Sequence, residues 1–457
     1  MITLADIRQL SDIRVMNLTS RALRFTGVST DSRTCMAGNL FFALRGESFD
    51  GHQFVSQVIG GGASAVVVDE SWFFKNTIAM RNVSAPFFCV PDTTKALGEL
   101  ARVYRKKFSI PVLAIGGSNG KTTTKEMIVA VLGKKFSVLG TQGNLNNHVG
   151  VPQMIFRLTR NHQIAVLELG TNHPGELAYL CSIAQPTHAL VTNIGNEHLE
   201  FFGDLQGVAQ EETELYRALD KKGCAFVNVD DPYLAAAGKM PATSVRYGMA
   251  SNSDVRALRP AIDALGRGSF GVRFKGKTSA SRIEIGIPGA HNRANGIAAA
   301  AVGLIFGVPF RSIVSALRDC KGASKRMQVL ERNGVVLLND TYNANPDSVR
   351  AALATLKDIQ SAGRKYVVLG DMLELGQRAA EEHEAIGREV ARLGFEHLAL
   401  FGPLAKNIAV GSGLAEAKHF DSKLELVSSL RASVRSGDVV LVKGSRGMKM
   451  EDVIDQL

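Results

Sequence analysis

The chain has 457 residues, of which 45% are hydrophobic and 21% are charged, and its formal net charge is +10. These values are ordinary for a globular protein and argue against a disordered chain. At roughly 100–200 residues per domain, the length predicts two to four domains.

Cysteine usage and the chain start indicate a cytoplasmic protein. The five cysteines are scattered and form no Cys-x-x-Cys pair, which argues against a disulfide framework or a zinc site. The first ten residues contain Asp6 and Arg8 and lack the apolar core of a signal peptide. The longest apolar run, residues 297–310, contains glycine and proline and is too short to span a bilayer. We interpret this run as a buried helix and expect no stable membrane insertion.

The positive charge is spread along the chain, and no run of five or more lysines and arginines occurs. This distribution favours a phosphate-bearing small ligand over a nucleic-acid partner.

The first two regions of the chain predict α/β structure. Up to residue 84, apolar runs at 40–44 and 63–68 predict strands of a small α/β unit. From residue 85 to 320, we expect a helix over 94–107 and a short strand over 111–115. Further apolar runs of this region end at polar residues and predict a buried parallel sheet; they are 164–167 before Glu168, 189–192 before Asn193 and 224–229 before Asp230.

The third region, residues 321–457, predicts a second doubly wound α/β domain. In open sheets of this kind, ligands bind beyond the carboxyl ends of the strands. Polar residues or glycine follow its strands; the strands are expected at 334–338 before Asp340, 366–369 before Asp371, 397–401 before Gly402 and 439–442 before Lys443.

Residues 116–122, Gly-Gly-Ser-Asn-Gly-Lys-Thr, follow an apolar strand and open a helix. Glycines let backbone N–H groups turn inward around phosphate oxygens, and the helix start adds a positive dipole end. Lys121 would pair with the β- and γ-phosphates, and the Thr122 hydroxyl would ligate Mg²⁺. Ile115 stands where the general Walker pattern has its first glycine, so the loop is a shortened variant. The alternative is an ordinary Gly-rich turn.

Several motifs in the same order resemble those of the Mur ligase superfamily, and the resemblance covers nearly the whole chain. Residues 117–122 resemble its phosphate loop. The motifs of the third region narrow the match to the ligases that add D-Ala-D-Ala; they are 343–348 (Asn-Ala-Asn-Pro-Asp-Ser), 370–376 (Gly-Asp-Met-Leu-Glu-Leu-Gly) and 442–448 (Val-Lys-Gly-Ser-Arg-Gly-Met). The first region matches at 29–33 (Ser-Thr-Asp-Ser-Arg), 41–46 and 50–52.

The resemblance implies a three-domain α/β enzyme that acts in peptidoglycan precursor synthesis. It implies a small N-terminal domain for the UDP-sugar (1–84), a central P-loop ATPase-like domain with a parallel sheet (85–320) and a C-terminal Rossmann-like domain (321–457). The implied reaction joins D-Ala-D-Ala to UDP-MurNAc-tripeptide through an acyl phosphate, with ATP and Mg²⁺. We expect a monomer.

The resemblance also implies an ATP site, in which Arg326 and Asp340 reach the γ-phosphate and the ribose. For the polar residues at 291–295, the alternative is helix N-capping. The implied ATP-binding residues are Gly117, Ser118, Asn119, Gly120, Lys121, Thr122, Thr123, His291, Asn292, Asn295, Arg326 and Asp340.

The implied substrate contacts come from all three domains. Asp31, Ser32 and Arg33 suit diphosphate and uridine contacts, although Asp-Ser-Arg alone would be interpreted as a solvated turn. The Gly-Asn stretch at 143–148 would alone be a polar turn. The implied substrate-binding residues are Ser29, Thr30, Asp31, Ser32, Arg33, Arg45, Gly46, Asn144, Asn146, Asn147, Asn343, Asn345, Ser348, Lys443, Ser445 and Arg446.

The implied Mg²⁺ ligands are Glu168 and His198, with Thr122, and the implied catalytic residues include these two and Lys121. Without the resemblance, Glu168 could be a polar strand tip and His198 a packed loop histidine. The sequence departs from the family pattern at one position. The family has a lysine there that is carbamylated and helps to hold a second Mg²⁺, whereas this chain has Glu212. We predict that Glu212 ligates the metal directly, since its carboxylate offers hard oxygens.

The sequence leaves alternatives open both for these glutamates and for the function. The glutamates at 211, 212 and 214 could form a solvated helix face. The function could also be a related ligase adding one amino acid or glutamate, a nucleic-acid-stimulated P-loop ATPase, or a non-catalytic nucleotide-binding module. The motifs at 343–348 and 371–376 argue against the related ligases, and the lack of an aromatic-plus-basic stripe argues against the nucleic-acid ATPase.

Overall fold

The computed structural model describes residues 1–18, 23–47, 49–80, 83, 85–238, 243–279 and 281–457. The chain forms two compact units. Unit 1 holds residues 1–114, 139–171 and 176–187, and unit 2 holds residues 115–138, 172–175 and 188–457. Ser84, where the sequence predicts the end of the first domain, lies outside the described residues.

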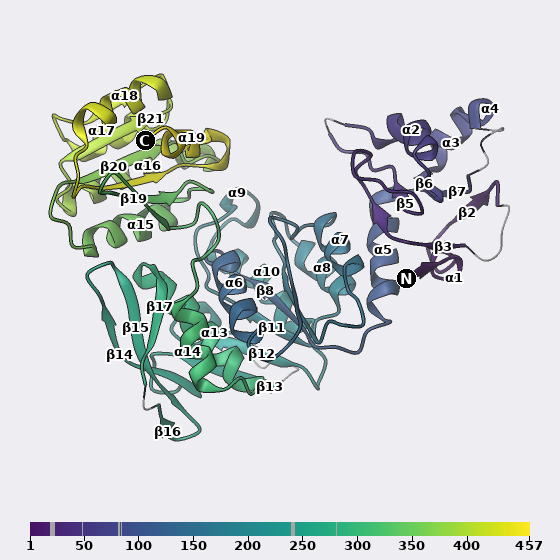
Figure 1. Cartoon of the computed structure of the whole chain (residues 1–457), viewed down its shortest axis with the longest axis horizontal. Coiled ribbons are helices and arrows are strands. Elements are labelled where there is room, and N and C mark those ends of the chain that lie inside the picture. The colour runs from purple at the N-terminus through teal and green to yellow at the C-terminus, as the bar shows by residue number, and fades with distance from the viewer. Residues whose placement is uncertain (19–22, 48, 81–82, 84, 239–242, 280) are drawn as a thin grey trace. The chain divides into compact units, whose positions relative to one another are not determined.

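The N-terminal part of unit 1 is built on a sheet in the order β2-β7-β6-β5-β4 (Figure 1). Strands β4 to β7 are parallel, and β2 pairs with β7 in the antiparallel sense. The expected strands at 40–44 and 63–68 are confirmed as β5 and β6. The elements of this part are β1 Ile2–Thr3, α1 Leu4–Ile7, β2 Arg14–Met16, β3 Arg24–Phe25, β4 Val28–Ser29, β5 Leu40–Phe42, a 3₁₀ turn Gly51–Phe54, α2 Val55–Gly60, β6 Ala65–Asp69, α3 Glu70–Lys75, α4 Thr77–Met80, β7 Phe87–Val90 and α5 Thr93–Arg105.

The central sheet has the strand order β16-β15-β14-β13-β12-β11-β8-β10-β9, and β17 pairs with β15. Strands β11 to β14 are parallel. The continuous apolar runs of β11 and β12 predicted this for their part of the sheet. The elements of this part are β8 Val112–Gly116, α6 Lys121–Leu132, β9 Val138–Gly140, α7 Gly150–Phe156, β10 Ile164–Glu168, α8 Glu176–Ala184, β11 His188–Val191, α9 Leu199–Phe202, α10 Leu205–Glu212, α11 Glu214–Arg217, β12 Cys224–Asn228, α12 Pro232–Ala235, β13 Thr243–Gly248, β14 Val255–Ile262, β15 Arg267–Phe274, β16 Lys277–Thr278, β17 Ile283–Pro288, α13 Ala290–Ile305 and α14 Phe310–Arg318.

The central sheet also has an antiparallel edge, which the sequence did not indicate. Strand β15 pairs antiparallel with β14, β16 and β17. The outer half of β14 is exposed, so it lacks the continuous apolar pattern of a strand buried on both faces.

The apolar run at 297–310 is also not one helix. Helix α13 ends at Ile305, and α14 begins at Phe310. Between them Gly307 has φ +69°, a conformation that favours glycine, and Pro309 precedes the new helix. Within the described residues, no helix is both long and apolar enough to cross a membrane.

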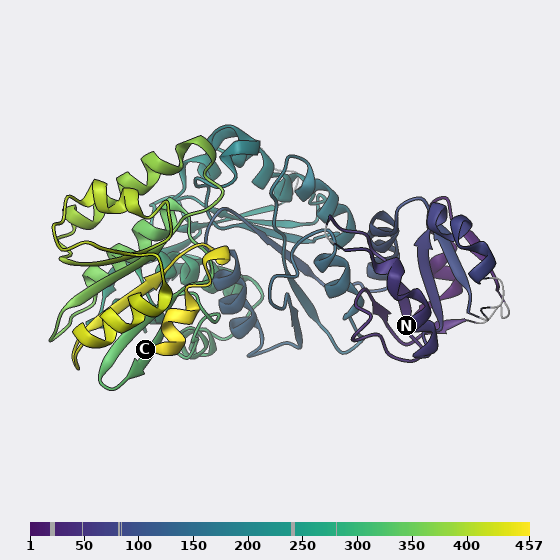
Figure 2. The same cartoon turned by 90° about the horizontal axis from the view of Figure 1, so that it is seen from above.

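The C-terminal part of unit 2 is a doubly wound domain with the strand order β18-β19-β23-β20-β21-β22. Its strands are parallel except for the β18–β19 pair. Figure 2 shows its helices, in yellow-green and yellow, on either side of the strands. Its elements are β18 Gln328–Arg332, β19 Val335–Asp340, α15 Pro346–Asp358, β20 Lys365–Gly370, a 3₁₀ turn Gly376–Arg378, α16 Ala379–Arg392, β21 His397–Phe401, α17 Lys406–Ser412, β22 Lys418–Phe420, α18 Lys423–Ser433, β23 Val439–Lys443, a 3₁₀ turn Arg446–Met448 and α19 Glu451–Gln456.

One buried arginine ties several segments of unit 1 together. Arg105, the last residue of α5, is only 4% exposed. Its Nε donates to Ala184 O at 3.0 Å, and its terminal nitrogens donate to the carbonyl oxygens of Phe108, Ile110 and Gln185. These bonds satisfy the carbonyls at the end of α8 and in the turn before β8, which would otherwise be buried without donors.

We expect Arg105→Lys to lower the free energy of unfolding by about 3 kcal/mol, the scale of leaving two or more buried carbonyls without donors. Lysine carries its donors on one nitrogen and cannot reach the same set of carbonyls. Urea denaturation measures the change, and Arg102→Lys on the exposed side of α5 is the matched control. Equal stability of the two variants would contradict a structural role for these bonds.

Candidate active site

The phosphate loop takes a backbone course that only glycine permits at two positions. Gly117 has φ +111°, and a Cβ atom there would lie 2.2 Å from Thr192 Oγ1. Gly120 has φ +81°, and its Cβ would lie 2.7 Å from Asn295 Oδ1. Both positions therefore combine a left-handed backbone with close neighbours, which explains the spacing of the glycines in the motif.

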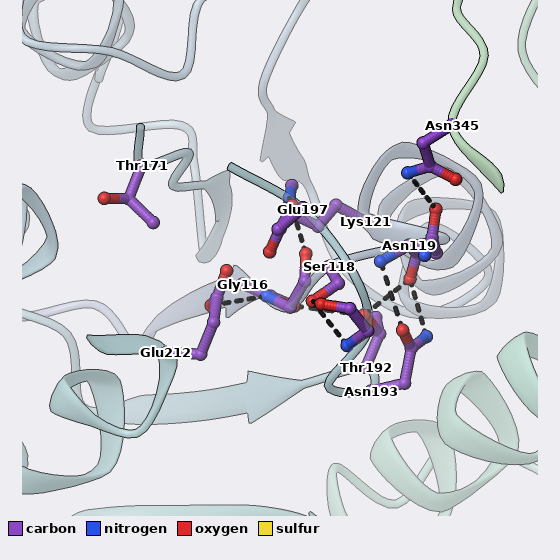
Figure 3. A network of polar contacts seen from close by, with 12 residues as sticks. Gly116, Ser118, Asn119, Lys121, Thr171, Thr192, Asn193, Glu197, Glu212 and Asn345 are labelled. Carbon is purple, nitrogen blue, oxygen red and sulfur yellow. Dashed lines mark hydrogen bonds and ion pairs between the residues drawn. The ribbon is translucent and has the colours of Figure 1, made fainter. Parts of the chain in front are cut away.

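The segment that follows β11 holds the loop from one side (Figure 3). Thr192 Oγ1 and Asn193 Nδ2 donate to Asn119 O at 2.7 and 2.8 Å. The Ser118 hydroxyl accepts from Gly195 N at 2.8 Å, and Ser118 N donates to Asn193 O at 2.9 Å. The loop is thus fixed before any ligand arrives, as a preorganised anion site requires.

Two acidic side chains lie at the same loop. Glu212, the last residue of α10, is fully buried, and its Oε2 accepts from Gly117 N at 2.6 Å. Glu197 is 9% exposed, and its Oε2 lies 3.4 Å from Lys121 Nζ. The Lys121 ammonium also donates to Gly117 O at 2.5 Å.

Burial raises the pKa of the Glu212 carboxyl to about 8, because a buried charge loses its hydration. The neighbouring Glu197 acts in the same direction, whereas Lys121 and the Gly117 N–H lower this pKa. The possibility of a solvated helix face is therefore wrong for Glu212. It is also wrong for Glu211, which is buried and accepts from Gly175 N at 2.8 Å.

The other sequence-predicted residues of this neighbourhood lie in unit 2. Thr122 and Thr123 lie in the first turn of α6 and are each 7% exposed. His198 lies between β11 and α9 with φ +46°, and its ring meets Phe202 edge-on. In the described part of the chain, no group of three or more His, Cys, Asp or Glu side chains is arranged to hold a metal ion.

Glu168 belongs to unit 1, where it ends β10 and is 3% exposed. Asn146 Nδ2 donates to Glu168 Oε1 at 2.9 Å, so this asparagine orients the carboxylate. The other oxygen, Oε2, is buried without a hydrogen-bond partner. Of the two neighbouring asparagines, Asn147 accepts from Gly150 N at the start of α7, and Asn144 is exposed.

The polar residues that open α13 form a short chain of side-chain bonds. Asn295 Nδ2 donates to Asn292 Oδ1 at 3.0 Å, and Asn292 Nδ2 donates to Pro288 O at 2.6 Å. His291 is exposed. Since Asn295 also packs against Gly120, the start of α13 supports the phosphate loop from a second side.

The C-terminal residues gather at the carboxyl ends of β19 and β23. Lys443 Nζ lies 2.6 Å from Asp340 Oδ2 and donates to Asn343 O at 2.9 Å. The Arg326 guanidinium stacks 3.8 Å from the centre of the Tyr342 ring. The Ser445 hydroxyl bonds Leu373 N and Ala344 O, and Arg446 pairs with Glu451.

Helix α15 begins with residues that contact the loops of the central domain. Asn345 and Ser348 form a capping box, which fixes the helix start. Asn345 Nδ2 also donates to Asn119 Oδ1 at 3.2 Å (Figure 3). Asp347 accepts from Asn196 N at 3.0 Å, a contact that the sequence did not predict.

In the N-terminal domain, the predicted substrate residues lie on loops of the sheet. Thr30 accepts a 2.7 Å bond from Gln153 of α7. Arg33 pairs with Asp31 at 2.6 Å, and this hydrogen-bonded arginine lowers the pKa of Asp31 to about 2. Arg45 pairs with Asp50 at 3.2 Å; Ser29 ends β4, Ser32 is half-buried, and Gly46 N bonds Phe49 O.

Three family models match the chain in succession. The Mur ligase family catalytic domain matches residues 24–105, the Mur ligase middle domain matches 115–303, and the Mur ligase glutamate ligase domain matches 325–446. The chain belongs to the Mur ligase family. The resemblance and the three-domain α/β fold expected from the sequence are both confirmed.

Relatives within this family match the chain over nearly its whole length. A UDP-N-acetylmuramoyl-tripeptide–D-alanyl-D-alanine ligase of Escherichia coli is 35% identical, covering 99% of this chain and 98% of that protein. The ligase of the same name from Bacillus subtilis is 34% identical over 94% of this chain and 93% of its own length.

Solved structures of such ligases are similar to this Mur ligase fold. The crystal structure of MurF from Acinetobacter baumannii has a TM-score of 0.88 and 32% identity, covering 100% of this chain and 98% of that chain. The MurF ligase from Thermotoga maritima, solved in complex with ADP, has a TM-score of 0.81 and 28% identity, covering 95% and 97%.

We expect Gly117→Ala in this Mur ligase to lower nucleotide affinity at least about tenfold, or about 1.4 kcal/mol. The added Cβ would collide with Thr192 and force the loop away from its course. Binding of a fluorescent ATP analogue measures the effect. Gly276→Ala is the control, because Gly276 also has a positive φ of +75° but no atom within 4 Å of the new Cβ. Wild-type affinity in Gly117→Ala would contradict the role of this turn.

Proposed function

We propose that this Mur ligase joins D-Ala-D-Ala to UDP-MurNAc-tripeptide, with ATP converted to ADP and phosphate. The near full-length similarity to ligases of that name supports this function most directly. The preorganised phosphate loop supports the same function, since the reaction begins at the γ-phosphate of ATP. The product belongs to the precursors of peptidoglycan.

The chemistry follows from the poor reactivity of a carboxylate. A carboxylate oxygen of the tripeptide attacks the γ-phosphorus as the bond to ADP breaks, giving an acyl phosphate. The amine of D-Ala-D-Ala then attacks the acyl carbon, phosphate leaves and the amine loses a proton. The loop N–H groups, the start of α6 and Lys121 stabilise the phosphate charge during the first step.

Mg²⁺ fits the residues of each unit. The carboxylate oxygens Glu168 Oε2, Glu197 Oε1 and Glu212 Oε1 are buried without a hydrogen-bond partner, and hard oxygens of this kind suit Mg²⁺. We propose Thr122, His198 and Glu212 as the ligands in unit 2. When bound, the ion would neutralise phosphate charge.

We further propose that the three domains divide the substrates among them. Residues 1–84 hold the UDP-sugar, residues 85–320 hold ATP, and residues 321–457 hold the dipeptide and the outer side of ATP. The pairing of Lys443 with Asp340 gives the third domain a rigid polar edge for these ligands. The proposed state is a monomer in the cytoplasm.

We expect phosphate release only when UDP-MurNAc-tripeptide and D-Ala-D-Ala are both present with ATP. The acyl phosphate needs the tripeptide, and its turnover needs the amine. A coupled phosphate assay with lysine- and diaminopimelate-containing tripeptides measures this requirement, with free D-alanine as the control amine. Equal turnover with free D-alanine would assign the chain to another activity of the family.

We expect Lys121→Ala to fold normally and to lower turnover at least about a hundredfold, the scale of losing one preorganised charge in the transition state. The side chain reaches the loop and Glu197 and contributes little to the core. Steady-state ligation measures the effect, and Lys134→Ala beyond the other end of α6 is the exposed control. Wild-type turnover in Lys121→Ala would remove this lysine from the mechanism.

A further inference from the structure

One buried carboxylate in the C-terminal domain holds two cations that come from different segments. Glu451, the first residue of α19, has a side chain that is only 10% exposed. Its Oε1 accepts from Lys325 Nζ at 2.8 Å and from Arg446 Nη1 at 2.7 Å. Lys325 lies just before β18, whereas Arg446 begins the turn after β23. Glu451 therefore joins the start of the domain to the loop that follows β23.

The charges around this carboxylate leave an excess of positive charge. Burial opposes the ionisation of Glu451, but the hydrogen bonds from Lys325 and Arg446 outweigh it and lower the pKa of the carboxyl to about 2. Glu451 is therefore ionised near neutral pH and faces two cations with one negative charge. The nearby Lys443 is already neutralised by Asp340. The loop after β23 can thus accept a further anion.

Arg446 is the cation that can reach such an anion. Its side chain is 54% exposed, although its position is fixed at both ends. The backbone N–H donates to Asn343 Oδ1 at 3.2 Å, and Nη1 donates to Glu451. Within the described residues, Nε and Nη2 of Arg446 make no hydrogen bond. A guanidinium presents its donors as a rigid fork, so this second edge suits the two oxygens of a carboxylate.

We propose that Glu451 is a positioning residue, which holds Arg446 so that its second edge binds the C-terminal carboxylate of the dipeptide. The inference rests on the proposed function, in which D-Ala-D-Ala reacts through its amine and keeps this carboxylate. The sequence indicated Arg446 for substrate binding in general and gave no role to Glu451. Anionic oxygens at Arg446 could also come from a nucleotide phosphate, so the experiment separates these two sources.

The test compares two amines that differ only at the carboxylate. Ligation by the full chain is measured with D-Ala-D-Ala and with its C-terminal amide, at saturating ATP and UDP-MurNAc-tripeptide. The wild type should prefer the free carboxylate in kcat/KM at least about tenfold, the scale of a charge-assisted hydrogen-bonded pair. Arg446→Gln should abolish this preference, because glutamine has neither the charge nor the fork.

Glu451→Gln should reduce the preference at least about fivefold, because Arg446 then loses its fixed orientation. The loss should appear in KM for D-Ala-D-Ala more than in kcat or in KM for ATP. Glu451→Asp keeps the negative charge but withdraws it by one methylene group, so it should lose part of the preference. The double variant with Arg446→Gln should resemble Arg446→Gln alone, since Glu451 acts through Arg446.

A matched control separates positioning from general acidity. Asp455→Asn removes a carboxylate from the exposed side of the same helix and should keep the wild-type preference. Circular dichroism melting checks that every variant is folded, and Glu451→Asp decides the question if Glu451→Gln does not fold.

Three results would overturn the proposal. The first is a wild type that ligates the amide as well as D-Ala-D-Ala. The second is a preference that Glu451→Gln leaves unchanged or strengthens, since removing a negative charge without disturbing Arg446 would favour an anion. The third is a rise in KM for ATP in place of KM for the dipeptide, which would assign Arg446 to a phosphate. A wild type that does not ligate D-Ala-D-Ala at all would instead refute the proposed function, so the two failures are distinguishable.

Discussion

The course of the phosphate loop at Gly117 is the constraint on which the rest of the site depends. Its positive φ turns the chain so that Gly117 N–H meets Glu212 and Gly117 O meets Lys121. The turn passes so close to Thr192 that no Cβ fits between them. The segment after β11 can therefore bond the next two residues of the loop, and α6 can begin with its N–H groups directed at a phosphate.

Much of the fold was predictable, because strands buried on both faces have continuous apolar sequences. Strands β10 and β21, for example, lie within a residue of the expected ranges. The antiparallel edge formed by β14 to β17 was not predictable in this way. Strands β14 and β15 are partly exposed and contain two arginines each, so their pairing depends on tertiary contacts that no local pattern reports.

The residues of the candidate site were likewise predictable only in part. Lys121 and Thr122 were found from the motif because the loop itself is contiguous in sequence. Glu197 gave no signal, since one glutamate beside a histidine in a loop is usually solvated. Only the fold shows that it is buried against Lys121. The hydrogen bond between Asp347 and Asn196 was also not predicted, because the two residues are far apart in the sequence.

The loop also shows why net charge says little about a local site. The chain carries +10 overall, yet the described groups around Lys121 include two buried carboxyl groups, and the pKa of one of them, Glu212, is raised to about 8. Distant surface cations are screened within about 10 Å at 0.1 M salt, so they contribute little to the electrostatic potential at this loop. The helix start supplies only partial positive charge. The charge at the phosphate loop is therefore set by Lys121, the neighbouring carboxyl groups and the loop N–H groups, and not by the net charge of the chain.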